Sequence, residues 1–168
     1  MENIIQASKL TKVYGEKETS VTALDNIDVQ FNENEFTAIM GPSGSGKSTL
    51  LHCLAGLDRP TSGQIFLKDQ DISTLNDKQL TKIRRDSFGF VFQAFNLIPT
   101  LTAEENITLP ASIAGRKPDM DWIKQVVETV DISDRLTHRP NELSGGQQQR
   151  VAAARAMATK PEVIFADE

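Results

Sequence analysis

A glycine-rich octapeptide, flanked by an apolar run and a helix-like segment, constrains the fold of this chain more than any other feature. It reads Gly41-Pro42-Ser43-Gly44-Ser45-Gly46-Lys47-Ser48 and fits the pattern G-x-x-x-x-G-K-[ST] at every fixed position. The preceding run Phe36–Met40 is apolar and partly β-branched, which predicts a buried strand. The segment Thr49–Ala55 predicts a helix, with Gly56 at its C′ position. Strand, glycine-rich turn and helix in this order predict an α/β fold.

The octapeptide, which we call the phosphate loop, has the physical chemistry of an anion site. Glycines allow φ > 0 and let the backbone approach a ligand with no Cβ in the way. Consecutive N–H groups line a concave nest, and the helix N-terminus adds partial positive charge. We expect Lys47 to reach the β- and γ-phosphates of a nucleoside triphosphate and Ser48 to ligate Mg²⁺. An ordinary glycine-serine turn is the alternative. The candidate nucleotide-binding residues here are Gly41, Pro42, Ser43, Gly44, Ser45, Gly46, Lys47, Ser48 and Thr49.

Composition and length limit which partners and which cellular compartment are expected for this chain. The chain has 168 residues and a formal net charge of −5, which argues against a nucleic-acid-binding surface as its main role. Its single cysteine excludes an internal disulfide and fits a reducing cytoplasm. There is no secretory signal and no apolar stretch approaching ~18 residues, so we expect no direct membrane insertion. Length predicts one domain, and any membrane association is expected to come through a partner.

A second chemical element is a short apolar strand that ends in two carboxylates. Val163–Ala166 is wholly apolar, as suits the middle of a parallel sheet, and Asp167 and Glu168 follow it. In α/β sheets the carboxyl ends of the strands form the edge where ligands bind. Asp167 suits a role in holding Mg²⁺-bound water, and Glu168 suits a general base that polarises the attacking water. Alone, such a pair is typical of a solvated loop, so this interpretation depends on the phosphate loop.

A third element indicates a family. The segment Leu143-Ser144-Gly145-Gly146-Gln147-Gln148-Gln149-Arg150 predicts a capping box that opens an alanine-rich helix, and its hydroxyl, N–H groups and helix N-terminus can face an anion. It closely resembles the signature motif of the ATP-binding cassette (ABC) ATPases, a resemblance that covers essentially the whole chain. The resemblance implies that two chains sandwich two ATP molecules head to tail. The candidate residues facing the nucleotide of the other chain are Ser144, Gly145, Gly146 and Gln147.

Two further residues match the family. Gln93 follows the β-rich run Phe88–Phe92 and resembles the Q-loop glutamine, which contacts Mg²⁺ and water near the docking surface of a membrane subunit. Tyr14 resembles the aromatic residue that stacks on adenine, although a tyrosine at this place is otherwise an ordinary sheet residue. The resemblance thus implies catalytic roles for Lys47, Gln93 and Glu168, and Mg²⁺ ligation by Ser48, Gln93 and Asp167.

The predicted architecture is a P-loop NTPase core with a parallel sheet, an N-terminal antiparallel β subdomain and a helical signature subdomain. The subdivisions are residues 1–35 (antiparallel β), 36–93 (core, ending at the Q-loop), 94–160 (helical) and 161–168 (the Asp-Glu strand). Within them, a helix near Lys78–Arg85 is capped by Asn76, and another opens at Thr102 and is interrupted or ended by Pro110. An apolar stripe over residues 122–130 is attributed to core packing.

The chain departs from the family pattern at its C-terminal end. Complete members continue into further strands and a switch histidine, whereas His52 and His138 both precede the Asp-Glu strand and cannot take that role. We therefore expect a C-terminally truncated cassette with these strands missing. One alternative is a nucleotide-binding fragment without turnover. Another is a soluble ABC ATPase of DNA repair or translation, which usually carries a coiled-coil insertion or a second cassette.

The favoured hypothesis is an ATP-hydrolysing subunit of an ABC transporter that binds ATP and Mg²⁺. Its expected partners are a second copy of the chain and a transmembrane permease, which would hold it at the cytoplasmic face of the membrane. The segments Gly56–Gly63 and Phe88–Pro99 resemble the branch that serves lipoprotein release, macrolide export and antimicrobial-peptide resistance. These residues are expected to form a surface that contacts a partner, so they do not identify the transported substrate.

Overall fold

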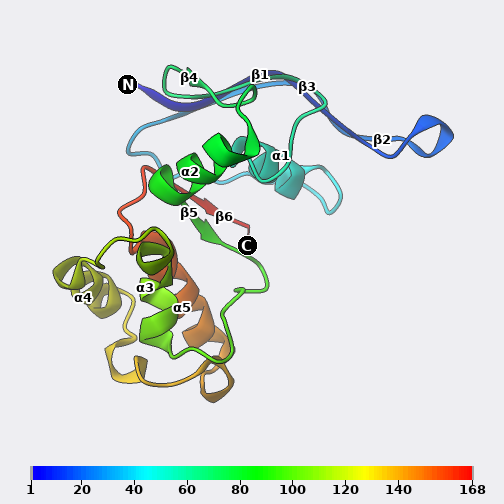
Figure 1. The fold of residues 1–168 in the computed structure, drawn as a ribbon. Coiled ribbons are helices and arrows are strands. Elements are labelled where there is room, and N and C mark those ends of the chain that lie inside the picture. The colour runs from blue at the N-terminus through cyan, green and yellow to red at the C-terminus, as the bar shows by residue number, and fades with distance from the viewer. Residues whose placement is uncertain (1, 168) are drawn as a thin grey trace. The chain divides into compact units, whose positions relative to one another are not determined.

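The computed structural model describes residues 2–167, and the chain divides into two compact units between Lys82 and Ile83. We describe each unit by itself, with the elements labelled as in Figure 1. The strands are β1 (Asn3–Tyr14), β2 (Val21–Asn32), β3 (Ser62–Leu67), β4 (Gln70–Asp71), β5 (Phe88–Val91) and β6 (Val163–Ala166). The α-helices are α1 (Lys47–Leu54), α2 (Asp77–Ser87), α3 (Ala103–Ile113), α4 (Met120–Thr129) and α5 (Gly145–Met157). Short 3-10 turns span Lys17–Thr19, Ser133–Arg135 and Pro140–Glu142.

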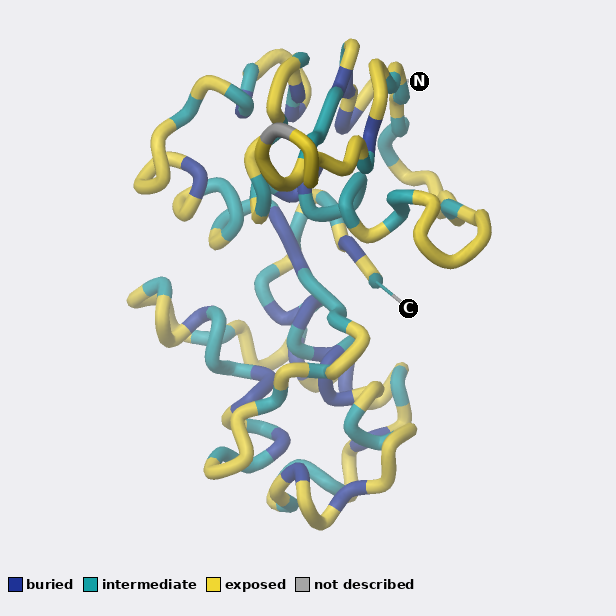
Figure 2. The backbone as a smooth tube through the Cα atoms, turned by 90° about the vertical axis from the view of Figure 1, so that its right-hand side faces the viewer, coloured by how far each residue is buried: buried dark blue, intermediate teal, exposed yellow. Residues whose placement is uncertain are grey.

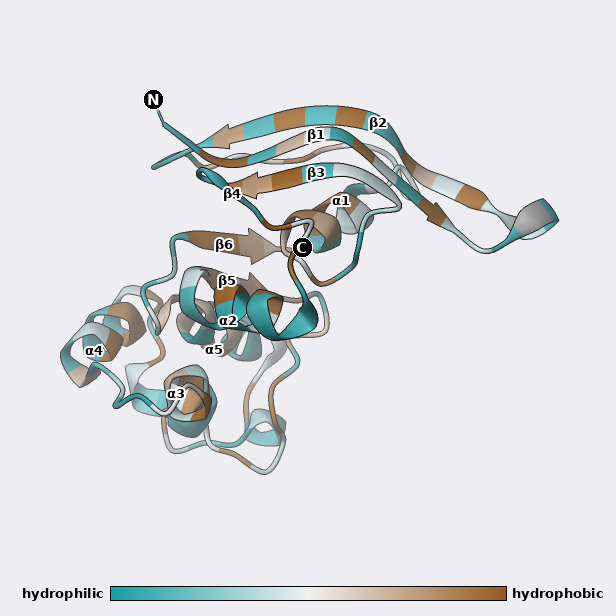
Figure 3. Cartoon of the chain, turned by 45° about the horizontal axis from the view of Figure 1, so that its top comes forward, coloured by the Kyte–Doolittle hydropathy of each residue, from teal (hydrophilic) through white to brown (hydrophobic). Residues whose placement is uncertain are grey.

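The first unit is built on an antiparallel sheet with the strand order β2-β1-β3-β4. Hydrophobic and hydrophilic residues alternate along β1 and β2, as Figure 3 shows, because one face packs inward and the other meets solvent. The inward face contributes Ile5, Leu10 and Ile65, which are each at most 1% exposed. Burial of each such side chain contributes roughly 1.5–3 kcal/mol. The predicted antiparallel sheet near the N-terminus is confirmed.

The predicted helix after the phosphate loop is confirmed, and so is the role of Gly56. At the end of α1 the N–H of Gly56 donates to the carbonyl of Cys53 (3.0 Å), and the N–H of Leu57 donates to that of His52 (2.9 Å). Gly56 has φ +63°, so these two bonds form a Schellman motif with glycine at C′. Asn76 caps α2, since its Oδ1 accepts from the N–H of Gln79 at 3.0 Å.

The predicted strand at Phe36–Met40 is wrong. This stretch has no regular secondary structure, and Phe36 and Met40 are 97% and 88% exposed. An extended segment becomes a strand only by pairing its backbone with a neighbour, and both sheets among the described residues are formed without this stretch. The apolar, β-branched composition was therefore insufficient, because strand formation depends on a pairing partner elsewhere in the molecule.

The second unit combines a parallel pair of strands with three α-helices. β5 and β6 pair in parallel from Phe88↔Val163 to Val91↔Ala166. Both strands are brown in the hydropathy colouring of Figure 3, without the alternation of β1 and β2. The predicted strand at Val163–Ala166 is confirmed as β6. Among the described residues it pairs with β5 alone, and Ile164 is 45% exposed, so one edge of this apolar strand is uncovered.

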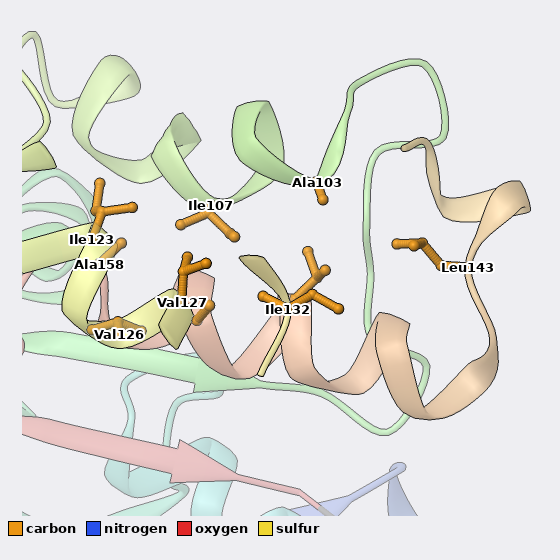
Figure 4. Close-up of a cluster of buried hydrophobic side chains, with 10 residues drawn as sticks. Ala103, Ile107, Ile123, Val126, Val127, Ile132, Leu143 and Ala158 are labelled. Atoms are coloured by element: carbon orange, nitrogen blue, oxygen red, sulfur yellow. The ribbon is translucent and has the colours of Figure 1, made fainter. Parts of the chain in front are cut away.

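The core of the second unit lies between α3, α4 and α5, and Figure 4 shows the side chains of these helices pointing toward one another. Ile107 and Val151 are 0% exposed there. The stripe predicted on α4 is confirmed as core packing, with Ile123, Val126 and Val127 all buried. Figure 2 shows buried residues distributed through both parts of the chain rather than gathered in one. In the part of the chain that the structure describes, no helix is long and apolar enough to cross a bilayer.

Two capping boxes in this unit are confirmed and one prediction is corrected. Thr102 and Glu105 form the predicted box at the start of α3. However, Pro110 neither ends nor interrupts α3, which continues to Ile113. Proline has no N–H to donate to the carbonyl four residues earlier, that of Asn106, so one helical bond is lost, and Pro110 lies in the last turns of the helix, which continues for three more residues. The box formed by Ser144 and Gln147 opens α5.

Candidate functional site

The phosphate loop adopts a backbone that favours glycine at two positions and requires it at one of them. Gly44 has φ +77° and Gly46 has φ +88°, both in the left-handed region. A Cβ on Gly46 would stand 2.5 Å from the carbonyl oxygen of Ala23, inside any tolerable contact. Gly46 is also the N-cap of α1, where it offers no side chain to cap the first turn. The N–H groups of the first turn therefore receive no hydrogen bond from an N-cap side chain.

Lys47 is the first residue of α1 and lies over the loop that precedes it. Its Nζ donates to the carbonyl oxygens of Gly41 (3.0 Å) and Pro42 (2.9 Å). The loop itself is closed by a bond from the N–H of Ser45 to the carbonyl of Pro42 at 3.2 Å. The ammonium group of Lys47 and the N-terminus of α1 are thus within a few residues of each other in the chain. Both carry positive charge, and together they attract a phosphate group.

Tyr14 lies at the C-terminal end of β1 and is 41% exposed. Its hydroxyl donates to Oδ2 of Asp58 at 2.6 Å, and the ammonium of Lys12 lies 4.7 Å from the ring centroid. The hydrogen bond to the Asp58 carboxylate, helped by burial, raises the pKa of Tyr14 above its ordinary value of 10.0. The ring therefore stays a neutral, partly exposed aromatic surface at physiological pH.

Cys53, also in this unit, takes no part in this chemistry. It is 0% exposed in α1, and burial raises its pKa to about 11. The thiolate, which is the reactive form, is scarce at neutral pH. Cys53 is a core residue.

In the second unit, Gln93 and Asp167 follow neighbouring parallel strands. The last pair of the ladder joins Val91 to Ala166, and the N–H of Asp167 donates to the carbonyl of Val91 at 2.9 Å. Both residues therefore lie at the carboxyl edge of the same pair of strands. Glu168, the predicted general base, lies outside the described residues.

The signature segment begins at the N-cap of α5. The hydroxyl of Ser144 accepts from the N–H of Gln147 at 3.3 Å, while Oε1 of Gln147 accepts from the N–H of Ser144 at 2.9 Å. The hydroxyl oxygen is thus used as an acceptor within the helix, while its O–H proton can be donated to another group. A Cβ added to Gly145 or Gly146 would meet nothing within 4 Å. The packing of this chain does not explain why glycine stands at either position.

Arg155, which the sequence analysis missed, joins α5 to the loop after β5. Its guanidinium donates to the carbonyls of Phe95 (2.7 Å) and Asn96 (2.6 Å), two successive non-glycine residues with positive φ. Burial lowers the pKa of Arg155, yet the two bonds hold the charged group in place. A basic residue among the buried alanines of α5 was the signal available in the sequence. A second close approach between α5 and β5 is at Gly89, where a Cβ would lie 2.3 Å from the carbonyl oxygen of Ala156.

The oxygen donors at these places fit Mg²⁺ better than a softer metal. Within residues 2–167, no group of three or more His, Cys, Asp or Glu side chains could hold a metal ion by itself. Magnesium commonly takes one or two protein oxygens and completes its shell with water and phosphate oxygens. A hydroxyl at Ser48, an amide at Gln93 and a carboxylate at Asp167 are donors of that type.

Comparison with known proteins decides the family. The ABC transporter family model matches residues 24–168. The chain belongs to the ABC transporter ATP-binding family. It is an ATP-binding ABC ATPase, as the signature segment and the phosphate loop predicted, and its α/β fold with an antiparallel subdomain is that of the family.

Individual curated relatives support the same family assignment. The chain is 45% identical over 170 residues to the lipoprotein-releasing system ATP-binding protein LolD of Cytophaga hutchinsonii, covering 100% of this chain and 76% of that protein. It is 46% identical over 167 residues to the macrolide export ATP-binding/permease protein MacB of Marinobacter nauticus, covering 98% of this chain and 26% of that protein.

A solved ABC transporter cassette, MJ0796 of Methanocaldococcus jannaschii, has the same fold. Its dimeric structure superposes with a TM-score of 0.89 at 45% identity and covers 96% of this chain and 72% of that chain. A second dimeric structure of the same protein represents a post-hydrolysis state bound to ADP and Pi, at 44% identity and with a TM-score of 0.88. The ABC family therefore supplies both the fold and the enzyme class.

Proposed function

We propose that this ABC protein is the motor subunit of a transporter, in which ATP draws two copies together head to tail. The phosphate loop of one copy, through Lys47 and Ser48, faces Ser144 and Gly146 of the other across the γ-phosphate. The observation that carries this proposal is the open space at Gly145 and Gly146. Glycine at a helix start that its own chain leaves uncrowded is expected where a ligand held by another molecule must come close.

Each remaining site residue has a role in this proposal. Tyr14 stacks on adenine, and Ser48, Gln93 and Asp167 supply oxygen ligands or hold water around Mg²⁺, which neutralises phosphate charge when it is bound. Glu168 polarises the attacking water. ATP contacts both copies in the closed state and one in the open state, so its binding favours closure and hydrolysis permits reopening.

The names of two relatives suggest which partner responds to the closure and reopening of the two copies. One is named for lipoprotein release and another for macrolide export with a fused permease, so we infer that a transmembrane permease binds near the loop after Gln93. Arg155 holds the backbone of that loop through Phe95 and Asn96, so a displacement of the loop would be transmitted to α5 and its signature segment. The protein would then lie at the cytoplasmic face of the membrane, held there by the permease.

Glu168→Gln in the full-length protein tests the proposed chemistry. Without the base, ATP binds but is not hydrolysed, so the variant is expected to accumulate as an ATP-bound dimer in size-exclusion chromatography with light scattering. Lys47→Ala is the control and should neither bind ATP nor dimerise. Hydrolysis at the parent rate by Glu168→Gln would show that another group is the base.

A further inference from the structure

Tyr14 belongs to a three-residue cluster that the family resemblance did not predict. Its hydroxyl donates to Oδ2 of Asp58 (2.6 Å), and Nζ of Lys12 donates to the other carboxylate oxygen, Oδ1 (2.7 Å). Lys12 also donates to the carbonyl of Arg59 at 2.7 Å, and its ammonium lies over the Tyr14 ring, 4.7 Å from the centroid. The ring is therefore held both at its hydroxyl end and over one face.

The Lys12 side chain is largely shielded from solvent, and the Asp58 side chain is partly covered. These side chains are 12% and 31% exposed, and residue Tyr14 as a whole is 41% exposed. An ion pair at an open surface adds little stability, but charge-assisted bonds gain strength as water is excluded. Burial alone would raise the pKa of Asp58, yet the hydrogen bonds from Lys12 and Tyr14 outweigh it and hold that pKa below its ordinary value.

The cluster is attached to the helix that begins in the phosphate loop. Asp58 comes directly after the Schellman motif of α1, and its N–H donates to the carbonyl of His52 at 3.1 Å. Thr49, in the first turn of the same helix, acts on the same hydroxyl, because it lowers the pKa of Tyr14, although by less than Asp58 raises it. Thr61 joins the following turn to β1, since its N–H donates to the carbonyl of Thr11 at 2.8 Å and its hydroxyl accepts from the N–H of Val13 at 2.9 Å. The Tyr14 ring and the phosphate loop are therefore both attached to α1 and the turn that follows it.

We propose that Lys12 and Asp58 are positioning residues for the nucleotide base, fixing the Tyr14 ring at the place and angle that a base bound through the phosphate loop requires. This inference rests on the proposed stacking role of Tyr14. Lys12 covers one face of the ring, so the base stacks on the opposite face. A ring that is already oriented loses little freedom on binding, which strengthens stacking without adding a contact.

The binding test compares ATP with inorganic tripolyphosphate, which has the phosphates but no base, by isothermal titration calorimetry. Asp58→Ala and Lys12→Met should each weaken ATP binding by about three- to tenfold and leave tripolyphosphate binding unchanged, because a well-placed aromatic pair is worth roughly 0.5–1.5 kcal/mol. Lys160→Met is the matched control. Lys160 also pairs with an aspartate (Asp119, 2.7 Å) and lies over an aromatic ring (Trp122, 5.4 Å), but in the second unit.

A spectroscopic test reports on the cluster without any nucleotide. Alkaline titration followed by phenolate absorbance gives the pKa of Tyr14, whose signal is identified by its loss in Tyr14→Phe. The parent should titrate above 10.0, because ionising the phenol breaks its bond to a carboxylate. Asp58→Ala, or Asp58→Asn if the alanine variant does not fold, should move the midpoint down toward 10.0. An unmoved midpoint would show that the bond does not exist in solution.

The outcomes separate this inference from the function on which it rests. If Tyr14→Ala binds ATP as the parent does, the stacking role itself fails. If Tyr14→Ala weakens ATP binding while Asp58→Ala and Lys12→Met do not, stacking stands and the positioning role is overturned. Equal weakening of ATP and tripolyphosphate by Asp58→Ala would also overturn it, because Asp58 would then support α1 rather than the ring.

Discussion

The phosphate loop and the signature segment are both glycine-rich starts of helices, yet the chain requires glycine in only one of them. Gly44 and Gly46 have positive φ, and Gly46 has no room for a Cβ beside Ala23. Gly145 and Gly146 lie within α5 and have open space around them. Glycine in a helix costs roughly 0.5–1 kcal/mol relative to alanine, and nothing in the fold of this chain offsets that cost. The first region is explained by its own fold, whereas for the second we propose the approach of a nucleotide held by another copy of the chain.

The largest effect on stability is expected at Gly46. Gly46→Ala combines left-handed φ with a collision against the Ala23 carbonyl, so its free energy of unfolding should fall by about 2–5 kcal/mol. Gly44→Ala is the matched control in the same loop, since it has positive φ with nothing within 4 Å and should lose about 1–2 kcal/mol. Chemical denaturation of both variants measures the difference. Equal losses would mean that the contact with Ala23 does not constrain the loop.

A smaller effect is expected from Ser144→Ala, which removes the N-cap of α5. The free energy of unfolding should fall by about 1 kcal/mol, the usual cost of a lost cap. Thr102→Ala removes the same kind of capping box from α3 and should cost about as much. The two variants should differ in ATP hydrolysis, which Ser144→Ala alone reduces. Similar hydrolysis by both would limit Ser144 to a structural role.

The smallest change, and of opposite sign, is expected from Gly146→Ala. Alanine fits the open space and favours the helix, so the free energy of unfolding should stay the same or rise by up to about 1 kcal/mol. Thermal unfolding of the single chain without nucleotide measures this. A marked loss of stability would mean that the fold itself needs glycine at this position, and the contrast with the phosphate loop would disappear.

Local signals in the sequence predicted much of this structure. The capping residues Asn76, Thr102 and Ser144 and the C′ glycine Gly56 act within a few residues of chain, so their roles could be read directly. The strands that precede Gln93 and Asp167 were also predicted from their apolar composition, but their parallel pairing was not.

What the sequence did not reveal depends on contacts between distant residues. Phe36–Met40 has the composition of a strand but forms none, because pairing is set elsewhere in the fold. Asp58 bonds Lys12 and Tyr14 from 46 and 44 residues away, and Arg155 reaches Phe95 across 60 residues. Pattern and propensity carry no information on such pairings. The contacts of Lys12 and Asp58 with Tyr14 could therefore be found only in the three-dimensional structure.

The most direct test of the contrast is the oligomeric state of Gly146→Ala in the Glu168→Gln background, measured with ATP and Mg²⁺ by analytical ultracentrifugation. We expect Glu168→Gln alone to form a dimer. The double variant should bind ATP with the same affinity per chain but remain monomeric, because the added methyl group occupies the place of the other copy's γ-phosphate. If the double variant dimerises as fully as Glu168→Gln alone, Gly146 does not face the nucleotide of the other copy.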